Sequence, residues 1–349
     1  MVFGKKEIVG LDIGSSAIKL AELKEARNGY QLKNIGETLL PPEAIVNKVI
    51  INSGAVVDTI STLVKDLGVK TKDVAISISG HSVIIKKVSI PNMSEKELRE
   101  AIPWELEQNI PHSIDNVNYD FQILPGESQE GNMDVLIVAA KKDVTEDYIA
   151  VANEAGLNPV VVDVDVFALE NMFEINYPLT DEVLALINIG ASVTNINILK
   201  GGVSIFARDI TAGGRQFTEW IQKEFNIGYD EAEKMKYSLG LTGISKDLDR
   251  ITRDFADLIC GEIERTIDFF TTTTSQKETV RKIVLGGGSS KVPYIKERLV
   301  ERIGASVEIV NPFKNIIHDP RDFDPEYILD IAPKMGVVIG LALRRKGDK

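Results

Sequence analysis

The chain has 349 residues, 44% of them hydrophobic and 26% charged, which excludes a disordered or fibrous protein and predicts about two globular domains. Its net charge of −12 argues against DNA or RNA as the main partner, because nucleic-acid-binding proteins usually carry a basic surface. The single cysteine, Cys260, excludes an internal disulfide framework and fits a reducing, cytoplasmic compartment.

The chain opens on a predicted strand that ends in a turn of small residues. Residues 7–16 read EIVGLDIGSS. Two strands joined by an Asn-Gly turn, a helix and a further apolar strand are expected next, at 17–23, 28–29, 30–39, 53–67 and 74–80. Asn-Gly is a common hairpin turn because both residues tolerate positive φ. This part of the sequence therefore predicts an α/β layer.

A segment of mixed pattern follows at 88–163. Ser94 and Glu97 have the spacing of a capping box, which predicts a helix starting there, and Pro103 is expected to kink or break it. The other expected elements are strands, a turn and a helix, at 119–124, 125–132, 134–140, 144–155 and 159–164. Together they predict a small separate α/β subdomain.

The opening pattern returns in the second half of the chain. Residues 183–192 read VLALINIGAS, so Asp12 corresponds to Asn188, with an offset of 176 residues (188 − 12). Gly14 and Ser16 correspond to Gly190 and Ser192 in the same way. Similar elements follow this copy, at 193–199, 201–202, 203–209, 214–225 and 282–288. Such a repeat predicts two α/β halves with a cleft between them, across which the two turns face each other.

The last apolar segment, 336–343, is short and is followed by Arg344, Arg345 and Lys346. Cations near a helix C-terminus interact favourably with the helix dipole, so a final core helix is favoured over a membrane-surface anchor. The sequence has no run of about 18 apolar residues and no export signal at its start, so no membrane-spanning segment is expected.

The turns of small residues have the composition of a phosphate-binding site. A turn of Gly, Ala and Ser lets backbone N–H groups approach an anion closely, and the Ser hydroxyls add donors. Asp12, just before the first turn, would lie near a phosphate-bound Mg²⁺, which prefers oxygen ligands and retains most of its water. The stretch LGGGSS at 285–290 precedes a helix expected at 292–303, whose N-terminus suits a phosphate or ribose. Each motif alone also fits an ordinary turn, but the three together favour a nucleotide site.

With these motifs the sequence resembles the actin, Hsp70 and sugar-kinase superfamily over its whole length. The resemblance implies an actin-like (ribonuclease H-like) α/β fold, duplicated into two domains with a nucleotide cleft and an inserted small α/β subdomain. Residues 163–169 and 331–340 resemble the starts of the two connecting helices. The implied division is 1–87 (subdomain 1A), 88–163 (inserted subdomain 1C), 164–185 (connecting helix of 1A), 186–225 (2A), 226–262 (2B), 263–330 (2A) and 331–349 (C-terminal helix of 1A).

The resemblance also implies three groups of site residues. The phosphate-binding group is Gly14, Ser15, Ser16, Lys19, Gly190, Ala191, Ser192 and Thr194. The group associated with Mg²⁺ and catalysis is Asp12, Asn188 and Asp165, of which Asp165 would orient the attacking water. The adenosine-binding group is Gly213, Gly214, Glu233, Lys236, Gly286, Gly287, Gly288 and Ser289. For Glu233 and Lys236 a solvated amphipathic helix with spaced charges remains an equal alternative.

The inserted segment resembles that of FtsA-like actin homologues and, more closely, that of the PilM family of type IV pilus assembly proteins. The similarity lies in 102–105 (IPWE), 110–111 (IP) and 120–124 (DFQIL), and the FtsA-type C-terminal membrane helix is not evident. The resemblance implies a cytoplasmic protein that binds ATP and Mg²⁺ and holds the N-terminal cytoplasmic peptide of a PilN-like inner-membrane protein near the insertion. It would thereby sit at the inner membrane and link the pilus motor to the alignment complex. Self-association into filaments, as in actin relatives, stays open.

One residue departs from the superfamily pattern. The second phosphate motif usually opens with Asp, but here it opens with Asn188. An amide neither accepts a proton at neutral pH nor adds negative charge near a metal. We therefore expect tight ATP binding with slow or negligible hydrolysis.

Two other functions compete with nucleotide-dependent assembly. A small-molecule kinase of the same fold would need a substrate pocket, with Asp12 or Asp165 as its base. A serine hydrolase is disfavoured because residues 80–84 (GHSVI) lack the final glycine of a nucleophile elbow. The three histidines, His81, His112 and His318, have no metal-ligand spacing.

Overall fold

The computed structural model describes residues 7–27, 29–124, 131–239, 245–273 and 278–348. Asn28 of the first predicted turn and residues 125–130 of the turn expected at 125–132 lie outside the described residues.

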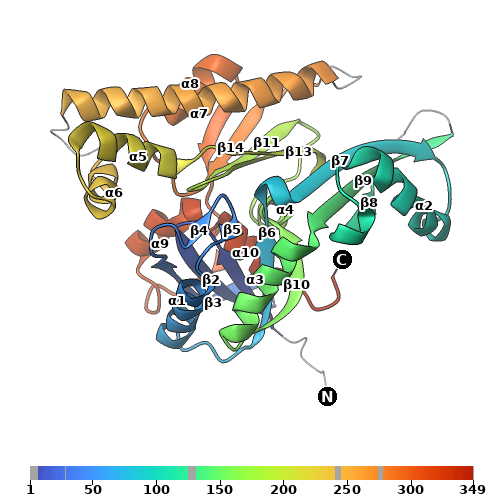
Figure 1. Cartoon of the computed structure of the whole chain (residues 1–349), viewed down its shortest axis with the longest axis horizontal. Coiled ribbons are helices and arrows are strands. Elements are labelled where there is room, and N and C mark those ends of the chain that lie inside the picture. The colour runs from blue at the N-terminus through green and yellow to red at the C-terminus, as the bar shows by residue number, and fades with distance from the viewer. Residues whose placement is uncertain (1–6, 28, 125–130, 240–244, 274–277, 349) are drawn as a thin grey trace.

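Two sheets of matching order form the two halves of the molecule (Figure 1). The first has the order β10-β6-β1-β2-β3-β16 and the second β13-β12-β11-β14-β15. In each half the central strand, β1 or β11, pairs antiparallel with the next strand and parallel with β6 or β14. The predicted duplication is thus confirmed at the level of strand order and direction. The strands are β1 Val9–Ile13, β2 Ala17–Ala26, β3 Gly29–Leu39, β6 Asp73–Ile78, β10 Asn158–Val164, β16 Ile316–Ile317, β11 Leu184–Ile189, β12 Thr194–Lys200, β13 Val203–Ile210, β14 Lys282–Gly286 and β15 Ser306–Ile309.

Helices cover the outer face of each sheet because each presents one apolar stripe to it. In the first half α1 and α3 pack on the sheet. Val56 and Ile60 of α1 and Tyr148 of α3 share one core with residues of the strands. In the second half α5, α6, α7 and α8 share a core with β11, β12 and β14, centred on Phe217 and Phe255. The helices are α1 Ser53–Asp66, α3 Lys142–Glu154, α5 Gly214–Phe225, α6 Tyr229–Tyr237, α7 Lys246–Thr273, α8 Ile295–Ile303 and α9 Pro325–Ile331, and a short hairpin, β4 Ile45–Val46 and β5 Val49–Ile50, precedes α1.

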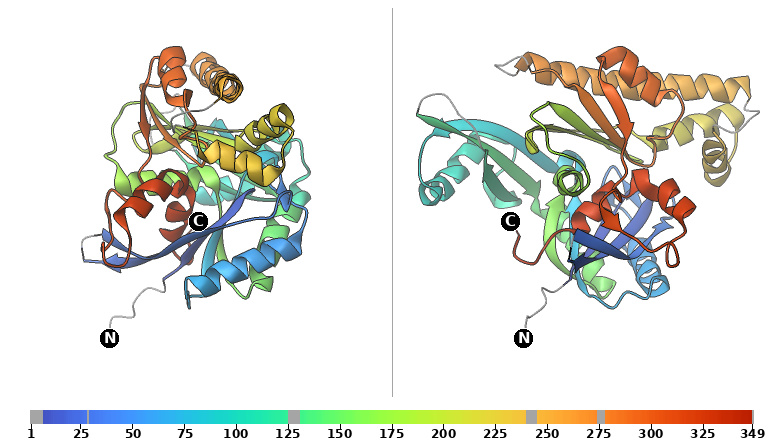
Figure 2. Two further views of the ribbon diagram at one scale, coloured as in Figure 1. Left: turned by 90° about the vertical axis from the view of Figure 1, so that its left-hand side faces the viewer. Right: turned by 180° about the vertical axis from the view of Figure 1, so that it is seen from behind.

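Two buried helices, α4 (Asp165–Asn176) and α10 (Gly336–Ala342), lie between the sheets (Figure 2). Their core includes residues of both halves, among them Leu184 of β11 and Ala21 of β2. They pack so closely that a Cβ on Gly340 would lie 1.7 Å from the carbonyl oxygen of Ala168. Every residue of α10 is buried, which confirms the prediction of a final core helix. No helix among the described residues is long and apolar enough to cross a membrane.

The inserted segment forms its own sheet, of order β7-β9-β8, against helix α2. The elements are β7 Val83–Pro91, α2 Glu95–Asn109, β8 Val117–Ile123 and β9 Asn132–Lys141. The capping box of Ser94 and Glu97 is present. The helix continues through Pro103, so the expected break does not occur, because Leu98, Ile102 and Leu106 anchor both sides of the proline in one core.

Two elements that the sequence analysis grouped with the insertion lie elsewhere. Strand β10 pairs parallel with β6 in the first large sheet, and the buried residues of α3 belong to that sheet's core. The sequence of a short apolar strand does not indicate which sheet the strand joins. The hydrophobic periodicity could therefore not separate these elements from the insertion.

Candidate functional site

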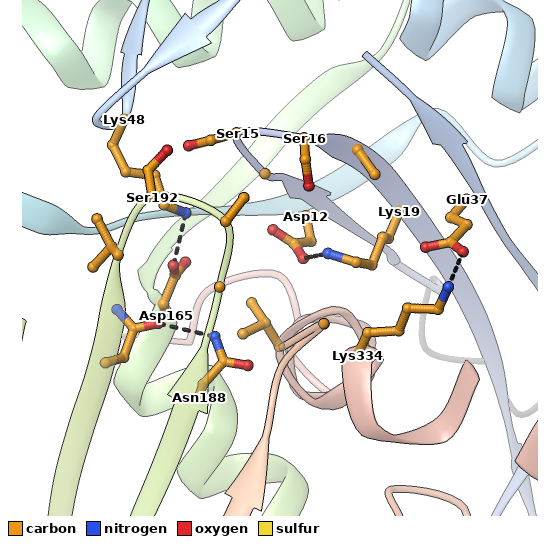
Figure 3. Close-up of a pocket in the computed structure, with 18 of the residues that line it drawn as sticks. Asp12, Ser15, Ser16, Lys19, Glu37, Lys48, Asp165, Asn188, Ser192 and Lys334 are labelled. Atoms are coloured by element: carbon orange, nitrogen blue, oxygen red, sulfur yellow. Dashed lines mark hydrogen bonds and ion pairs between the residues drawn. The ribbon is translucent and has the colours of Figure 1, made fainter. Parts of the chain in front are cut away.

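A cleft between the two halves contains most of the predicted site residues. It consists of two adjoining cavities with volumes of about 110 and 360 Å³. The first cavity lies between the two duplicated turns (Figure 3). The second extends from there toward α6 and the Gly-rich turn after β14. The residues shared by both cavities are Ser16, Ala191, Tyr237, Gly288 and Lys334.

The first turn joins β1 to β2 and brings five predicted residues to the first cavity: Asp12, Gly14, Ser15, Ser16 and Lys19. The turn closes with a hydrogen bond of 3.1 Å from the Gly14 N–H to the Ala17 carbonyl. Asp12 and Lys19 stand opposite each other on the antiparallel strands, and the Lys19 ammonium lies 2.7 Å from Asp12 Oδ2. Both side chains are largely buried, so this ion pair forms one wall of the cavity.

The second turn repeats this backbone. The Gly190 N–H donates to the Val193 carbonyl at 3.0 Å, and Asn188, Gly190, Ala191 and Ser192 line the same cavity. Thr194 does not line either cavity, because it points away and donates its hydroxyl to the Ala212 carbonyl at 2.9 Å. The first turn of α5 donates hydrogen bonds to this loop.

That support depends on glycine. Gly214 and Arg215 donate their backbone N–H groups to the carbonyls of Gly190 and Ala191 at 2.9 and 2.8 Å. A Cβ on Gly213 would lie 2.5 Å from the Gly190 carbonyl oxygen, so only glycine permits this close approach. Gly213 therefore shapes the loop and does not itself line the cleft.

Two hydroxyls in the first cavity have no hydrogen-bond partner among the described residues. Ser15 Oγ and Ser192 Oγ come from opposite turns, and their residues are only 6% and 7% exposed. A buried hydroxyl without a partner is costly, and such groups in native structures usually meet a ligand or an ordered water. Both residues line the first cavity, from opposite turns, and an anion bound there is a candidate partner for their hydroxyls.

Asp165 stands at the floor of the first cavity, at the start of α4. Its carboxylate lies 2.9 Å from the Lys48 ammonium (Figure 3). It also accepts hydrogen bonds of 2.6 Å from both Ser77 Oγ and Ser79 Oγ. Burial favours the neutral carboxyl, but the Lys48 charge and the two serine hydroxyls outweigh it and lower the pKa of Asp165. Burial also disfavours the charged ammonium, yet the attraction of Asp165 prevails and raises the pKa of Lys48.

Residues predicted to bind adenosine gather around the second cavity. Gly214, Glu233, Lys236, Gly287, Gly288 and Ser289 line it. Lys236 donates to Glu233 at 2.7 Å and to the Gly214 carbonyl at 3.1 Å, so these two α6 side chains face α5 and the cavity instead of open solvent. Burial lowers the pKa of Lys236, against the attraction of Glu233. Gly286 lies outside both cavities, packed against Val310.

The Gly-rich turn approaches the second loop closely. Gly287 has φ +92° and its Cβ would lie 2.3 Å from the Ile189 carbonyl oxygen, which the Ser289 N–H contacts at 3.1 Å. Glycine is required at this position on both grounds.

A chain of polar contacts leads from the cleft to the root of the insertion. Asn188 Nδ2 donates to Asn195 Oδ1 at 3.0 Å, and Asn195 Nδ2 donates to Asp209 Oδ1 at 2.8 Å. Asp209 Oδ2 then accepts the backbone N–H of Gly80 at 2.5 Å, just before β7. Burial raises the pKa of Asp209, and the bonds from Asn195 and Gly80 offset part of this rise.

Sequence reasoning missed several cleft residues that come from distant segments. Lys48 lies on the β4–β5 hairpin, 117 residues before Asp165. Arg215 reaches from α5 across to the first half and donates to the carbonyls of Ser15 and Ile45 at 3.1 and 2.9 Å. Lys334, which lines both cavities, pairs with Glu37. Only Arg215 carried a local signal, since it follows the two glycines that were singled out.

A nucleotide fits this cleft better than a metal ion alone. The unpartnered hydroxyls, the Lys19 and Lys48 ammonium groups and the glycine turns suit phosphates. Across the described ranges, no group of three or more His, Cys, Asp or Glu side chains could hold a metal ion. A Mg²⁺ ion would therefore depend on phosphate oxygens, with Asp12 as the nearby carboxylate.

Comparison with known proteins identifies a family. The family profile of type IV pilus assembly protein PilM matches residues 10–346. A solved PilM–PilN type IV pilus biogenesis complex contains a chain that is 30% identical, with a TM-score of 0.85, covering 97% of this chain and 98% of that one.

More distant relatives share the fold. Cell division protein FtsA of Staphylococcus epidermidis strain RP62A is 23% identical, over 89% of this chain and 76% of FtsA. MreB5 of Spiroplasma citri, solved with bound ADP, has a TM-score of 0.52 at 14% identity and covers 96% of this chain and 94% of its own. These similarities confirm the predicted actin-like fold.

Proposed function

The chain belongs to the PilM family of type IV pilus assembly proteins, and from this premise we propose that it is a nucleotide-dependent assembly factor. It binds ATP in the cleft between its halves and holds the N-terminal cytoplasmic peptide of a PilN-like inner-membrane protein near the inserted sheet. The partner is taken from the similarity to PilM in the PilM–PilN complex. The protein would then work at the cytoplasmic face of the inner membrane and connect motor components to the alignment complex.

The observation that carries ATP binding is the pair of buried, unpartnered hydroxyls on opposed turns, Ser15 and Ser192. Ser15, Lys19 and Ser192 line one cavity from both halves, so a polyphosphate bound there would bridge the halves. Gly287 to Ser289 and the Glu233–Lys236 pair supply the adjoining cavity for ribose and base. Bound Mg²⁺ would neutralise phosphate charge, with Asp12 reaching it through water.

Closure of the cleft on ATP can be transmitted to the partner site through the chain of polar contacts described above. Asn188 lies in the cleft, and Asp209 at the far end holds the Gly80 N–H before β7. A shift of the second half on closure would therefore move the root of the insertion. The two states must bind ATP with different affinity for this to alter the partner site.

Slow hydrolysis is part of the proposal. Asn188 offers no carboxylate beside the phosphates, and Asp165 is already engaged by Lys48, Ser77 and Ser79 with a lowered pKa. A carboxylate held in this way is a weak acceptor for the proton of an attacking water. A radiolabelled ATP assay should give turnover far below ordinary enzyme rates of about 10 per second. Adding small hydroxylated compounds to the same assay tests the kinase alternative, for which phosphoryl transfer would count.

The site assignment is tested by titrating ATP with Mg²⁺ into the purified chain and into Asp12→Ala. We expect at least a tenfold loss of affinity in the variant. The nucleotide-free protein should still fold, but at lower stability, because Lys19 loses its partner. Thr194→Val is the matched control, because its hydroxyl points to Ala212 and not into the cleft. Unchanged ATP affinity in Asp12→Ala would contradict the assignment.

The partner is tested with a synthetic peptide of the PilN-like N-terminus, titrated with and without ATP. Binding should depend on nucleotide in the natural protein. Asp209→Ala should keep ATP binding but bring the two peptide affinities together, since it removes the contact to Gly80. A peptide that does not bind in either state would contradict the partner assignment.

A further inference from the structure

Lys48 occupies an unusual position for a lysine. It forms the tip of the β4–β5 hairpin with Asn47, and the two residues have φ +68° and +48°. Asn suits this left-handed region, whereas lysine is seldom found there. Outliers of this kind persist where the surroundings hold them, and they gather at functional sites.

The hairpin is held in place from below. Tyr148 of α3, which is 1% exposed, donates its hydroxyl to the Lys48 carbonyl at 3.1 Å. The Lys48 stem passes close to the second turn, since a Cβ on Gly80 would lie 3.5 Å from Lys48 Cγ and 3.7 Å from Val193 Cγ2. The backbone and stem of Lys48 are therefore fixed, and its ammonium is aimed at one place.

The Lys48 ammonium has donors to spare. A lysine ammonium has three donors, and within the described residues Asp165 is its one hydrogen-bond acceptor. The Asp165 carboxylate also accepts hydrogen bonds from the hydroxyls of Ser77 and Ser79, so three donors hold it in place. The ammonium can thus donate hydrogen bonds to an additional anion while it keeps its contact with Asp165.

The cavity beside Lys48 is built for that anion. Lys48 lines the first cavity together with the unpartnered hydroxyls of Ser15 and Ser192 (Figure 3). It does not line the second cavity, where the adenosine residues gather. Lys48 therefore stands at the end of the cleft farther from the proposed base site, where the last phosphate of a nucleotide would lie.

We propose that Lys48 recognises the terminal phosphate of a nucleoside triphosphate and so makes the cleft discriminate triphosphate from diphosphate. Asp165 is then a positioning residue for Lys48 and does not orient a water molecule. The inference rests on the proposed nucleotide site and adds to it the group that reads the third phosphate. Lys19, by contrast, lies in the wall formed with Asp12.

The test compares the binding of AMPPNP and ADP at fixed Mg²⁺ by calorimetry. Lys48→Met keeps the length of the side chain and the backbone constraint but removes the charge. We expect AMPPNP affinity to fall at least tenfold and ADP affinity to change less than twofold. Equal losses for the two nucleotides, or no loss, would overturn the role of Lys48 while leaving the nucleotide site intact. If the natural protein binds neither nucleotide, the proposed function itself is wrong.

Lys48→Met leaves the buried Asp165 carboxylate without its cation, which can unfold the protein. The double variant Lys48→Met/Asp165→Asn removes both charges at nearly constant volume and should show the same selective loss. Lys48→Arg should retain most of the discrimination. Tyr148→Phe removes only the hairpin tether of Lys48 and should lower AMPPNP affinity more than ADP affinity, but less than Lys48→Met does. Inorganic phosphate, titrated alone, should not bind at AMPPNP concentrations; Lys48-dependent phosphate binding at such concentrations would overturn a nucleotide role.

Discussion

The two copies of the phosphate-loop hairpin share a backbone and differ in charge. Asp12 and Lys19 face each other across the first hairpin, and the residues in the same register of the second are Asn188 and Asn195. The first pair is an ion pair at 2.7 Å, and the second is an amide pair at 3.0 Å. The cross-strand contact is thus present in both copies, charged in the first and neutral in the second. The side-chain amide of Asn195 also donates to Asp209, which links the neutral copy to the insertion.

Helix α4 shows the same contrast between the halves. Asp165 meets Lys48 of the first half, and its pKa is lowered. Glu170 lies about one turn later and accepts from Asn197 of the second half at 3.3 Å. Burial raises the pKa of Glu170 to about 7, because Asn197 compensates only in part and Glu174 adds repulsion. The first half supplies cations for buried acids, and the second half supplies amides.

Breaking the ion pair should have the largest effect. Lys19→Met leaves Asp12 buried without its partner, and we expect a loss of about 3 kcal/mol in the free energy of unfolding. ATP affinity should fall about 100-fold, which corresponds to about 2.7 kcal/mol. Urea denaturation and calorimetry measure the two quantities. The control Asp12→Asn/Lys19→Met should recover much of the stability but little of the affinity. A single variant as stable as the natural protein would show that the pair is not important for folding.

The shared backbone is tested by alanine at equivalent glycines. A Cβ on Gly14 would lie 2.8 Å from the Ala17 carbonyl oxygen, and one on Gly190 lies 2.8 Å from that of Val193. We expect each variant to lose about 2 kcal/mol of stability, and the two losses to agree. Gly54→Ala in α1 is the control, because it meets only the Asn52 side chain at 3.6 Å and should be neutral or slightly stabilising. Clearly unequal losses would argue against equivalent turns.

The burial of Glu170 beside an amide predicts an effect of pH on stability. Its folded-state pKa of about 7 exceeds the ordinary value of 4.5, so the folded chain binds more protons between these values. Its contribution to stability is therefore most favourable below about pH 4.5 and is lost as the pH rises to about 7. Glu170→Gln should be more stable than the natural protein at pH 8, by about 1 to 2 kcal/mol, and similar at pH 5. Denaturation curves of both proteins at pH 8 and pH 5 test this prediction. A difference in stability that is the same at both pH values would contradict the assignment.

The smallest effect should come from restoring an acid to the second copy. Asn188→Asp removes the donor to Asn195 and introduces a charge without a lysine opposite, and we expect a loss of about 1 kcal/mol. Asn188→Asp/Asn195→Lys recreates the first pair and should regain stability relative to the single variant. Chemical denaturation of the three proteins measures this difference. A single variant that is more stable than the natural protein would show that charge is tolerated there.

The sequence predicted the parts of the site that depend on local backbone. Both turns, the Gly-rich stretch before α8 and the α5 glycines were found because small residues in these positions have a geometric reason. Lys48 could not be found in this way, because its position in the site depends on its contact with Asp165, 117 residues later in the chain. Thr194 was wrongly expected to face the cleft because a motif gives the position of a side chain and not its direction.

At larger scale, the repeat predicted the duplicated sheets, because strand order follows from the repeated sequence of elements. It did not assign β10 to its sheet, since any apolar strand with a free edge available can pair there. The boundaries of the subdomains remain predictions. Side-chain networks such as Asn195 to Asp209 to Gly80 require three segments to be brought together and were not foreseen.

The contact between α4 and α10 limits how the halves can move. With the Gly340 Cα placed so near the Ala168 carbonyl that not even a methyl group fits, the two helices have no room to slide past each other. Relative movement of the two helices is therefore restricted at this crossing. Since Asp165 and Val337 at the cleft floor belong to the same two helices, the contact that joins them also holds the floor of the cleft in shape.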